Sequence, residues 1–204
     1  MAVAMISAII AYLVLLNPFA LFLYLEPLML DLSNRQFNIV LVKATIISFM
    51  ITLIFFLFGD YLFQNILKID IESMRILGGI VLFSFAYFNI VKGRKGFIQM
   101  KENLTDLASE IALPFMIGAG TLSLTIMMRH QLPFWIGVLS FLIIFSFNHI
   151  FVMLLKAFKD QISKRKFKVA YDKNMQILLR INGFIVGAVG IDMIVTGIKA
   201  IFFP

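Results

Sequence analysis

Few residues in this 204-residue sequence have the type and spacing that chemistry requires. There is no cysteine, and the two histidines, His130 and His149, are far apart in sequence. Disulfides, thiolate catalysis and cysteine metal sites are therefore excluded. Asp192 is a lone carboxylate within a long apolar run. Enzymes need an acid–base pair, an activated nucleophile or a metal site. We find no such set, and we expect no enzyme, no metal and no cofactor.

Two interrupted segments are better candidates for a functional site. Asn17-Pro18 lies in the first apolar run. Proline removes a helical hydrogen bond and pushes the preceding residue away from the α region, so Asn17 is a predicted break point. The fourth run contains Pro114 and then Gly118-Ala119-Gly120-Thr121, followed by Ser123. Glycines on both sides of Ala119 make a continuous helix unfavourable there. Both segments expose backbone groups that can bind a ligand.

The elements that carry these segments are predicted to be membrane spans. Hydrophobic residues make up 61% of the chain and charged residues only 14%, where a soluble domain has about a quarter. The sequence predicts an all-α membrane protein with one transmembrane domain, 1–204. Barrel strands are excluded because the apolar runs do not alternate. Six apolar runs are expected to be helices: 2–30, 39–63, 76–91, 107–128, 133–155 and 181–203. The third of these, 76–91, holds 16 residues and is short for a membrane span.

The distribution of Lys and Arg predicts the orientation. Fourteen of the 18 fall in the odd-numbered connections and four in the others. The positive-inside rule therefore predicts a multi-pass protein of the cytoplasmic (inner) membrane with both termini outside. We interpret the basic loops as contacts for anionic lipid and expect no nucleic-acid binding. Hydrophobic residues between 158 and 175 fit either a short amphipathic helix on the inner leaflet or packing against the bundle.

The chain shows signs of an internal duplication. Residues 75–81 (RILGGIV) resemble residues 180–186 (RINGFIV) at an offset of 105. Repeat one would cover about 1–100 and repeat two about 101–204, and three spans in each half give the halves opposite topology. The interrupted first and fourth helices then correspond, and paired interruptions in inverted repeats are typical of transport sites. The alternative is that both are ordinary kinks.

We therefore predict a substrate site at mid-membrane between the two interruptions. The half-helix ends suit charged groups, because N-termini carry a partial positive charge that favours a carboxylate, and C-termini favour an ammonium group or another cation. The predicted substrate-binding residues are Asn17, Pro18, Gly118, Ala119, Gly120, Thr121 and Ser123.

Other polar residues in the apolar runs are candidates for coupling or for structure. Asp192 is the candidate for coupling to a proton or Na⁺, because a mid-membrane carboxylate by default marks a pathway; a hydrogen-bonded structural acid is the alternative. His149 is expected to be a hydrogen-bonded packing residue. Glu26 is expected to reach towards the membrane interface.

These segments resemble a known family. Residues 17–20 (NPFA) are similar to the Asn-Pro-x-Gly element of the MarC family, and residues 113–123 (LPFMIGAGTLS) to its Pro-x-x-x-Gly-Pro-Gly-Ala-Ile-Ser element. Residues 78–83 and 197–199 fit too. The chain departs from the pattern at Ala20, Leu23 and Ala119. The resemblance implies a six-span inner-membrane transporter of small neutral amino acids such as glycine or alanine. The alternative is a membrane-embedded scaffold or an efflux-related protein without amino acid transport. Oligomerisation stays open.

Overall fold

The computed structural model describes residues 2–92, 104–162 and 168–202, and within these ranges the chain is helical and contains no strand. Two short segments, η1 and η2, are π-helical. The elements follow one another as α1 (Ala2–Leu16), α2 (Pro18–Asp31), α3 (Asn34–Asp60), η1 (Tyr61–Leu67), α4 (Ile71–Lys92), α5 (Leu104–Ile111), η2 (Ala112–Met116), α6 (Ala119–Gln131), α7 (Phe134–Ile162) and α8 (Lys168–Phe202).

Five stretches are long and apolar enough to cross a membrane. They are Val3–Asp31, Asn34–Leu67, Ile71–Phe88, Phe134–Gln161 and Arg180–Phe202. Many large apolar side chains on their outer surfaces are exposed, including Val3 and Phe184. Such a surface is stable in lipid and not in water. The segment 104–131 is not among the five, because it is divided into α5, η2 and α6.

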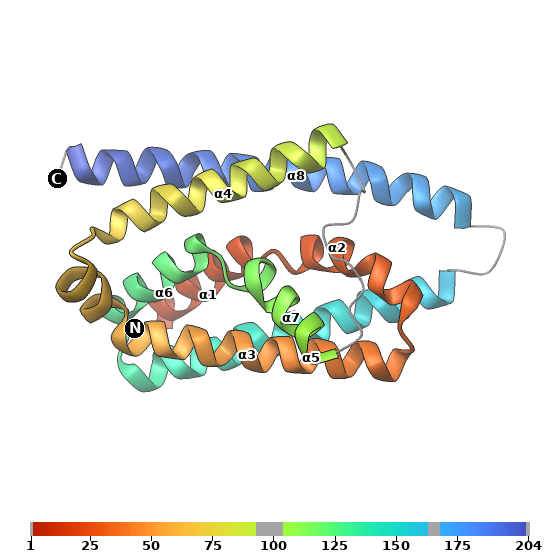
Figure 1. The fold of residues 1–204 in the computed structure, drawn as a ribbon, viewed down its shortest axis with the longest axis horizontal. Helices are drawn as coiled ribbons and strands as arrows, with labels where there is room; N and C mark the ends of the chain where they lie inside the picture. The colour runs from red at the N-terminus through yellow and green to blue at the C-terminus, as the bar shows by residue number, and fades with distance from the viewer. Residues whose placement is uncertain (1, 93–103, 163–167, 203–204) are drawn as a thin grey trace.

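The helices form two layers. Helices α4 and α8 lie against each other, and the remaining helices form a second layer beside them (Figure 1). Helix α1 begins and α8 ends at the same end of the molecule (Figure 1). Glycines allow the α4–α8 contact: a Cβ on Gly79 would lie 2.4 Å from the Gly190 carbonyl oxygen, and one on Gly190 2.7 Å from the Gly79 oxygen. Small residues at such contacts are typical of membrane helices.

Aromatic side chains fill the centre of the second layer. Tyr12 of α1 is fully buried and meets the rings of Phe141 and Phe145 edge-on, with centroids 5.7 and 6.2 Å apart. The Phe141 ring also contacts Phe56 of α3 at 5.2 Å. The Tyr12 hydroxyl lies 3.3 Å from the Thr52 hydroxyl, which satisfies its polar end inside the core. This cluster joins α1, α3 and α7.

The helix boundaries differ in places from the sequence prediction. The third span is not short: α4 has 22 residues and includes Glu72 and Arg75, whose side chains pair at 2.8 Å within its first turn and a half. Ser33 caps α3 in a capping box with Gln36. Thr105 lies in the first turn of α5, and its hydroxyl accepts a hydrogen bond from the Lys43 ammonium at 2.8 Å.

The predictions for the charged end of the bundle also need correction. We predicted that Glu26 reaches the membrane interface, but its side chain is only 2% exposed and lies 3.4 Å from the Lys159 ammonium. Lys156 is buried as well, and it donates to Asn34 and to Asp160. Helix α7 extends through both lysines instead of ending before them. These lysines therefore contact polar groups of α2, α3 and α7 within the bundle.

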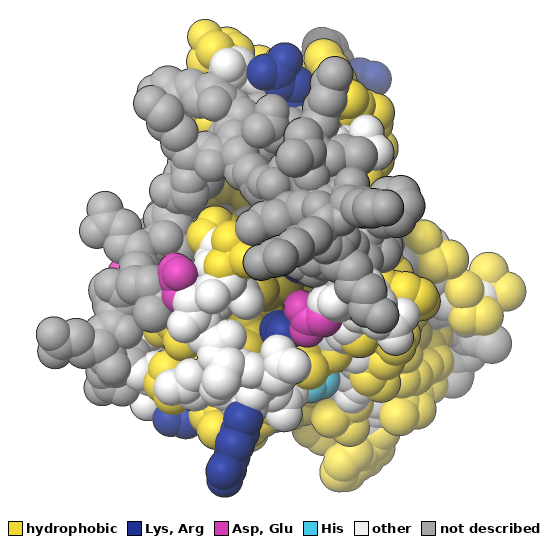
Figure 2. All heavy atoms as spheres, turned by 90° about the vertical axis from the view of Figure 1, so that its right-hand side faces the viewer, with side chains coloured by type: hydrophobic (Ala, Val, Ile, Leu, Met, Phe, Trp, Pro, Cys, Tyr) yellow, Lys and Arg dark blue, Asp and Glu magenta, His cyan; other side chains and the backbone are white. Residues whose placement is uncertain are grey.

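The same end of the molecule carries charged side chains at its surface. Figure 2 views the end opposite the one where α1 begins and α8 ends, and it shows separate Lys, Arg, Asp and Glu side chains among the described residues, with a hydrophobic flank beside them. The described residues between 158 and 175 do not form a separate amphipathic helix: residue 158 belongs to α7 and residues 171 and 175 to α8. The basic segments 93–103 and 163–167, where we predicted lipid contacts, lie outside the described residues.

Candidate functional site

The junction between α1 and α2 is a break of one residue. Asn17 has φ 47° and ψ 75°, in the left-handed region, and Pro18 is the first residue of α2. Asparagine tolerates this conformation better than most residues. The Asn17 Oδ1 accepts a hydrogen bond from the backbone N–H of Ala20 at 3.0 Å. This side chain therefore caps α2 and holds its N-terminus in place.

The same side chain ties the break to α8. The Asn17 amide donates to the Oδ1 of Asn182 at 2.9 Å, and Asn182 is buried. Sequence reasoning used residue 182 only as part of the repeat and did not predict it as a site residue. Its position in the apolar run 181–203 was the available signal, because a buried amide in a membrane helix needs a partner.

The second interruption is longer. Leu113, the residue before Pro114, has extended backbone (φ −118°, ψ 118°), as expected from the steric effect of proline. Ile117 and Gly118 are extended too, and α6 begins at Ala119. The Thr121 hydroxyl accepts a hydrogen bond from the Gly118 N–H at 2.9 Å and lies 3.0 Å from the Gly118 oxygen. Thr121 thus fixes the turn that starts α6.

Helix α4 lies directly against this second N-terminus. A Cβ built on Gly78 would lie 2.5 Å from the Gly120 nitrogen and 2.9 Å from the Ala119 carbonyl carbon. Both are backbone atoms, which cannot move aside as a side chain can. Glycine at position 78 is therefore required for α4 to approach the start of α6 this closely.

The two interruptions border one small cavity, which we call the inner cavity. Its volume is about 70 Å³, and a water molecule occupies roughly 10–15 Å³ by this measure, so it has room for a few waters. Five of the predicted site residues line it: Asn17, Gly118, Ala119, Gly120 and Thr121. Pro18 lies next to it in the first turn of α2 and is not among the lining residues.

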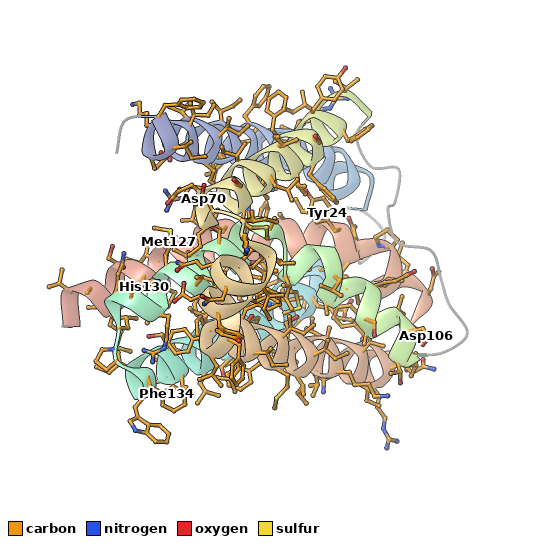
Figure 3. The ribbon with its side chains drawn as sticks, turned by 60° about the vertical axis from the view of Figure 1, so that its left-hand side comes forward. Tyr24, Asp70, Asp106, Met127, His130 and Phe134 are labelled. Carbon is orange, nitrogen blue, oxygen red and sulfur yellow. The ribbon has the colours of Figure 1, made fainter. Side chains whose placement is uncertain are left out.

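Tyr24 also lines the inner cavity and was missed by sequence reasoning. It lies on α2 seven residues after Asn17, two helical turns along the same face, and that spacing was the signal that could have found it. Its ring packs edge-on against Phe85 of α4, with centroids 5.6 Å apart. Figure 3 shows Tyr24 on the side of α2 that faces the α4–α8 layer.

The remaining predicted residues border a second and larger cavity, the outer cavity, of about 550 Å³. Ser123 and Asp192 line it, together with Arg75 of α4. Leu15 and Gly120 border both cavities, so the two adjoin each other. Met127, which lines the outer cavity, lies nearer than Tyr24 to the end where α1 begins (Figure 3). The structure therefore separates Ser123 and Asp192 from the other predicted site residues.

Most of the inner cavity's lining is apolar, and much of its polar character comes from the backbone at the helix ends. The first N–H groups of a helix have no partner within it and carry a partial positive charge, while the last carbonyls carry a partial negative charge. The starts of α2 and α6 and the end of α1, at Leu15 and Leu16, all meet at this cavity. Partial charges of both signs therefore border this one cavity. Among the described residues, no three His, Cys, Asp or Glu side chains are grouped to hold a metal ion.

The comparison with known proteins decides the family. Residues 2–202 match the pattern described as "MarC family integral membrane protein". The chain belongs to the MarC family. Among its MarC-like relatives, a UPF0056 membrane protein of Buchnera aphidicola is 30% identical over 203 residues, covering 92% of this chain and 88% of the relative.

More distant relatives match the chain along most of its length. A UPF0056 membrane protein of Pyrococcus horikoshii is 23% identical, covering 94% of this chain and 92% of the relative. The UPF0056 inner membrane protein YhgN of Escherichia coli is 22% identical, with 95% of each chain covered. No solved structure matches this MarC protein. Family membership establishes an integral membrane protein, and the names of the relatives do not state a substrate.

Proposed function

We propose that this MarC protein is a secondary transporter of small neutral amino acids, such as glycine or alanine, across the cytoplasmic membrane. The observation that carries the proposal is the meeting of two helix N-termini, of α2 and of α6, at one small cavity inside a membrane protein. An apolar helical bundle does not need a cavity bordered by helix N-termini for its stability. We therefore assign this cavity to a water-soluble substrate such as an amino acid.

The inner cavity fits the two charged ends of a zwitterion. The substrate carboxylate would bind at the first N–H groups of α6, around Ala119 and Gly120. The ammonium group would face the carbonyl groups at the end of α1, near Leu16. The small volume favours substrates with little or no side chain, because larger ones would meet Tyr24 and Phe85.

Contacts across the chain support an inverted repeat of six spans. Residues 77 and 78 correspond to 182 and 183 in the repeat. Gly78 of the first half lies against the start of α6, and Asn182 of the second half binds Asn17 at the start of α2. Each half therefore supplies a residue from this repeated segment, at neighbouring positions of it, to the interruption of the other half. The segment from α5 to α6 also leads from one end of the bundle towards the other (Figure 1).

The orientation and the competing functions are part of the same proposal. With the 14-to-4 division of basic residues, the end where α1 begins and α8 ends would face outward. A scaffold or an efflux-related protein without amino acid transport is the competing function. A scaffold explains the helices but gives no reason for two helix N-termini at a shared cavity.

Uptake of radiolabelled alanine and glycine by purified protein in lipid vesicles tests the proposal. Gly120→Leu should abolish uptake, because the leucine side chain would occupy the boundary between the inner and outer cavities. Gly120→Ala is the matched control: its Cβ would meet the flexible end of Met193 at 3.0 Å, so uptake should persist. Normal thermal stability and insertion must accompany the loss in Gly120→Leu. Wild-type vesicles that take up neither amino acid would overturn the proposal.

Asp192 remains the proposed coupling residue, for a proton or for Na⁺. Asp192→Asn keeps size and most hydrogen bonding while it removes the charge. Coupling by this carboxylate predicts that uptake loses its dependence on the pH or Na⁺ gradient while exchange of bound substrate continues at saturating substrate concentration. Concentration of substrate against a gradient by this variant would assign Asp192 a different role.

A further inference from the structure

The outer cavity has the composition of a ligand site in its own right. Its volume of about 550 Å³ lies in the range of roughly 300–1,000 Å³ that small-molecule sites occupy. Two charged side chains of opposite sign are among the described residues that line it, Arg75 from α4 and Asp192 from α8. The rest of its lining is mostly apolar or uncharged. A cavity with one cation and one anion matches a ligand that carries both charges.

Arg75 is held in place at this cavity. Its guanidinium pairs with Glu72 at 2.8 Å and donates to the sulfur of Met127, and its side chain is 14% exposed. A guanidinium has five N–H donors in a rigid plane, so two contacts leave donors for a ligand. A carboxylate is the group that such a fork binds best.

Ser123 supplies an independent sign of a ligand. It is 1% exposed, it borders the outer cavity, and its hydroxyl has no hydrogen-bond partner in the described part of the chain. A buried hydroxyl without a partner is unfavourable by about 1–3 kcal/mol. Native proteins rarely keep such groups unless water, an ion or a ligand satisfies them. The neighbouring Thr121 and Thr125 hydroxyls bond to backbone oxygens within the chain, which makes Ser123 the exception among them.

The partition between the two cavities is thin. Gly120 and Leu15 border both. Met193 lines the outer cavity, and its methyl carbon would lie 3.0 Å from a Cβ on Gly120. Leu82 lines the inner cavity and would lie 3.7 Å from the same Cβ. Methionine is unbranched and adaptable, so its movement can open a passage beside a residue that has no side chain.

We propose that the outer cavity is a loading site for zwitterionic amino acids, in which Arg75 binds the carboxylate, Asp192 binds the ammonium group and Ser123 donates a hydrogen bond. The ligand then passes Met193 and Gly120 into the inner cavity. This inference rests on the proposed transport function, because it names a second site on the same substrate's path. The loading site gives Arg75 and Asp192 a role in substrate binding. The inner cavity does not use these two side chains, because its polar groups belong mainly to the backbone.

A single introduced thiol can test the site, because the chain has no cysteine. Ser123→Cys in lipid vesicles is treated from each face with a charged, membrane-impermeant methanethiosulfonate reagent. The thiol should react from the face where α1 begins, and alanine should slow the reaction. Gln131→Cys, at an exposed helix end, should react without protection, and Ile143→Cys, on the apolar surface of α7, should not react. Thr196→Cys, which also lines the cavity, repeats the test if Ser123→Cys does not fold.

Ligands that carry only one of the two charges identify the partners. Alaninamide lacks the carboxylate and propionate lacks the ammonium group, so each should need a concentration at least about tenfold higher than alanine for half-protection. Arg75→Gln should remove the preference for alanine over alaninamide, and Asp192→Asn the preference over propionate. Asn17→Ala, which changes the inner cavity alone, should reduce uptake and leave protection of the Ser123→Cys thiol unchanged.

The outcomes separate this inference from the proposed function. Absence of alanine uptake by the wild-type protein contradicts the transport function itself. Uptake without protection by alanine contradicts the loading site alone. Failure of the Ser123→Cys and Thr196→Cys thiols to react from either face, while Gln131→Cys reacts, would mean that lipid fills the outer cavity, and this too would overturn the inference.

Discussion

The two interruptions expose a helix N-terminus at the same cavity by different means. The first is one residue long, and a side chain controls it: Asn17 adopts left-handed backbone, caps α2 and binds Asn182. The second extends from Leu113 to Gly118, and backbone contacts control it, because Gly78 of α4 lies against Gly120. A side-chain anchor tolerates some backbone movement, whereas a contact between two backbones does not. We therefore expect the two regions to respond differently to substitution.

The largest expected effect concerns the side-chain anchors of α2. Besides Asn17, this helix is held by Glu26, which is paired with Lys159 of α7 and almost fully buried. Removal of one partner of a buried ion pair costs about 3–5 kcal/mol, because the other charge loses its compensation. Glu26→Gln should therefore lower thermal stability in detergent markedly. The double variant Glu26→Gln/Lys159→Met should recover much of the loss, and failure to recover would show that the two side chains do not act as a pair.

The second prediction concerns the backbone contact at α6. Gly78→Ala places a methyl group 2.5 Å from a backbone nitrogen, so α4 must move away from α6. Overpacking of this kind costs about 1–3 kcal/mol. Melting temperature and alanine uptake should both fall. Gly120→Ala, on the opposite side of the same contact, meets only the flexible end of Met193 and should change stability much less. Equal losses in the two variants would contradict the distinction between backbone and side-chain neighbours.

The smallest expected effect is at Asn17, and it separates conformation from hydrogen bonding. Asn17→Ala loses the cap and places alanine in the left-handed region, each at a cost of about 1 kcal/mol. Asn17→Gly loses the same side chain but accepts the conformation, so it should be the more stable variant. Thermal unfolding of both proteins in one detergent measures the difference. Stabilities in the reverse order would show that the left-handed backbone is not maintained without the asparagine side chain.

Sequence reasoning predicted the membrane class, the helical architecture and the family, and these are confirmed. Composition alone excludes a soluble domain, and Asn-Pro and Gly-x-Gly act on the backbone within a few residues of where they occur. Five predicted substrate residues lie together at the inner cavity, because the two interruptions that contain them meet there. Their role in binding stays a prediction, as do the inverted repeat and the orientation.

Other features were decided by which helices become neighbours. No sequence pattern indicated that Glu26 is buried, since its partner Lys159 is more than 130 residues away and was assigned to a loop. Sequence reasoning also predicted that Ser123 belongs with Gly118 and Thr121, but the helical rotation after Gly120 places Ser123 at the outer cavity.

What the sequence determined by itself is therefore local or compositional. It determined that lipid surrounds the protein, that the chain is helical, and where a helix cannot continue. Steric rules for proline and glycine operate over one turn, and the preference for lipid is a sum over residues, so neither depends on distant contacts. Only the tertiary structure decided that Gly78 meets Gly120, that Asn17 meets Asn182 and that the cavity is divided in two. These depend on the packing of α4 and α8 against the other helices, and the energy of a close contact exists only once both partners are in place.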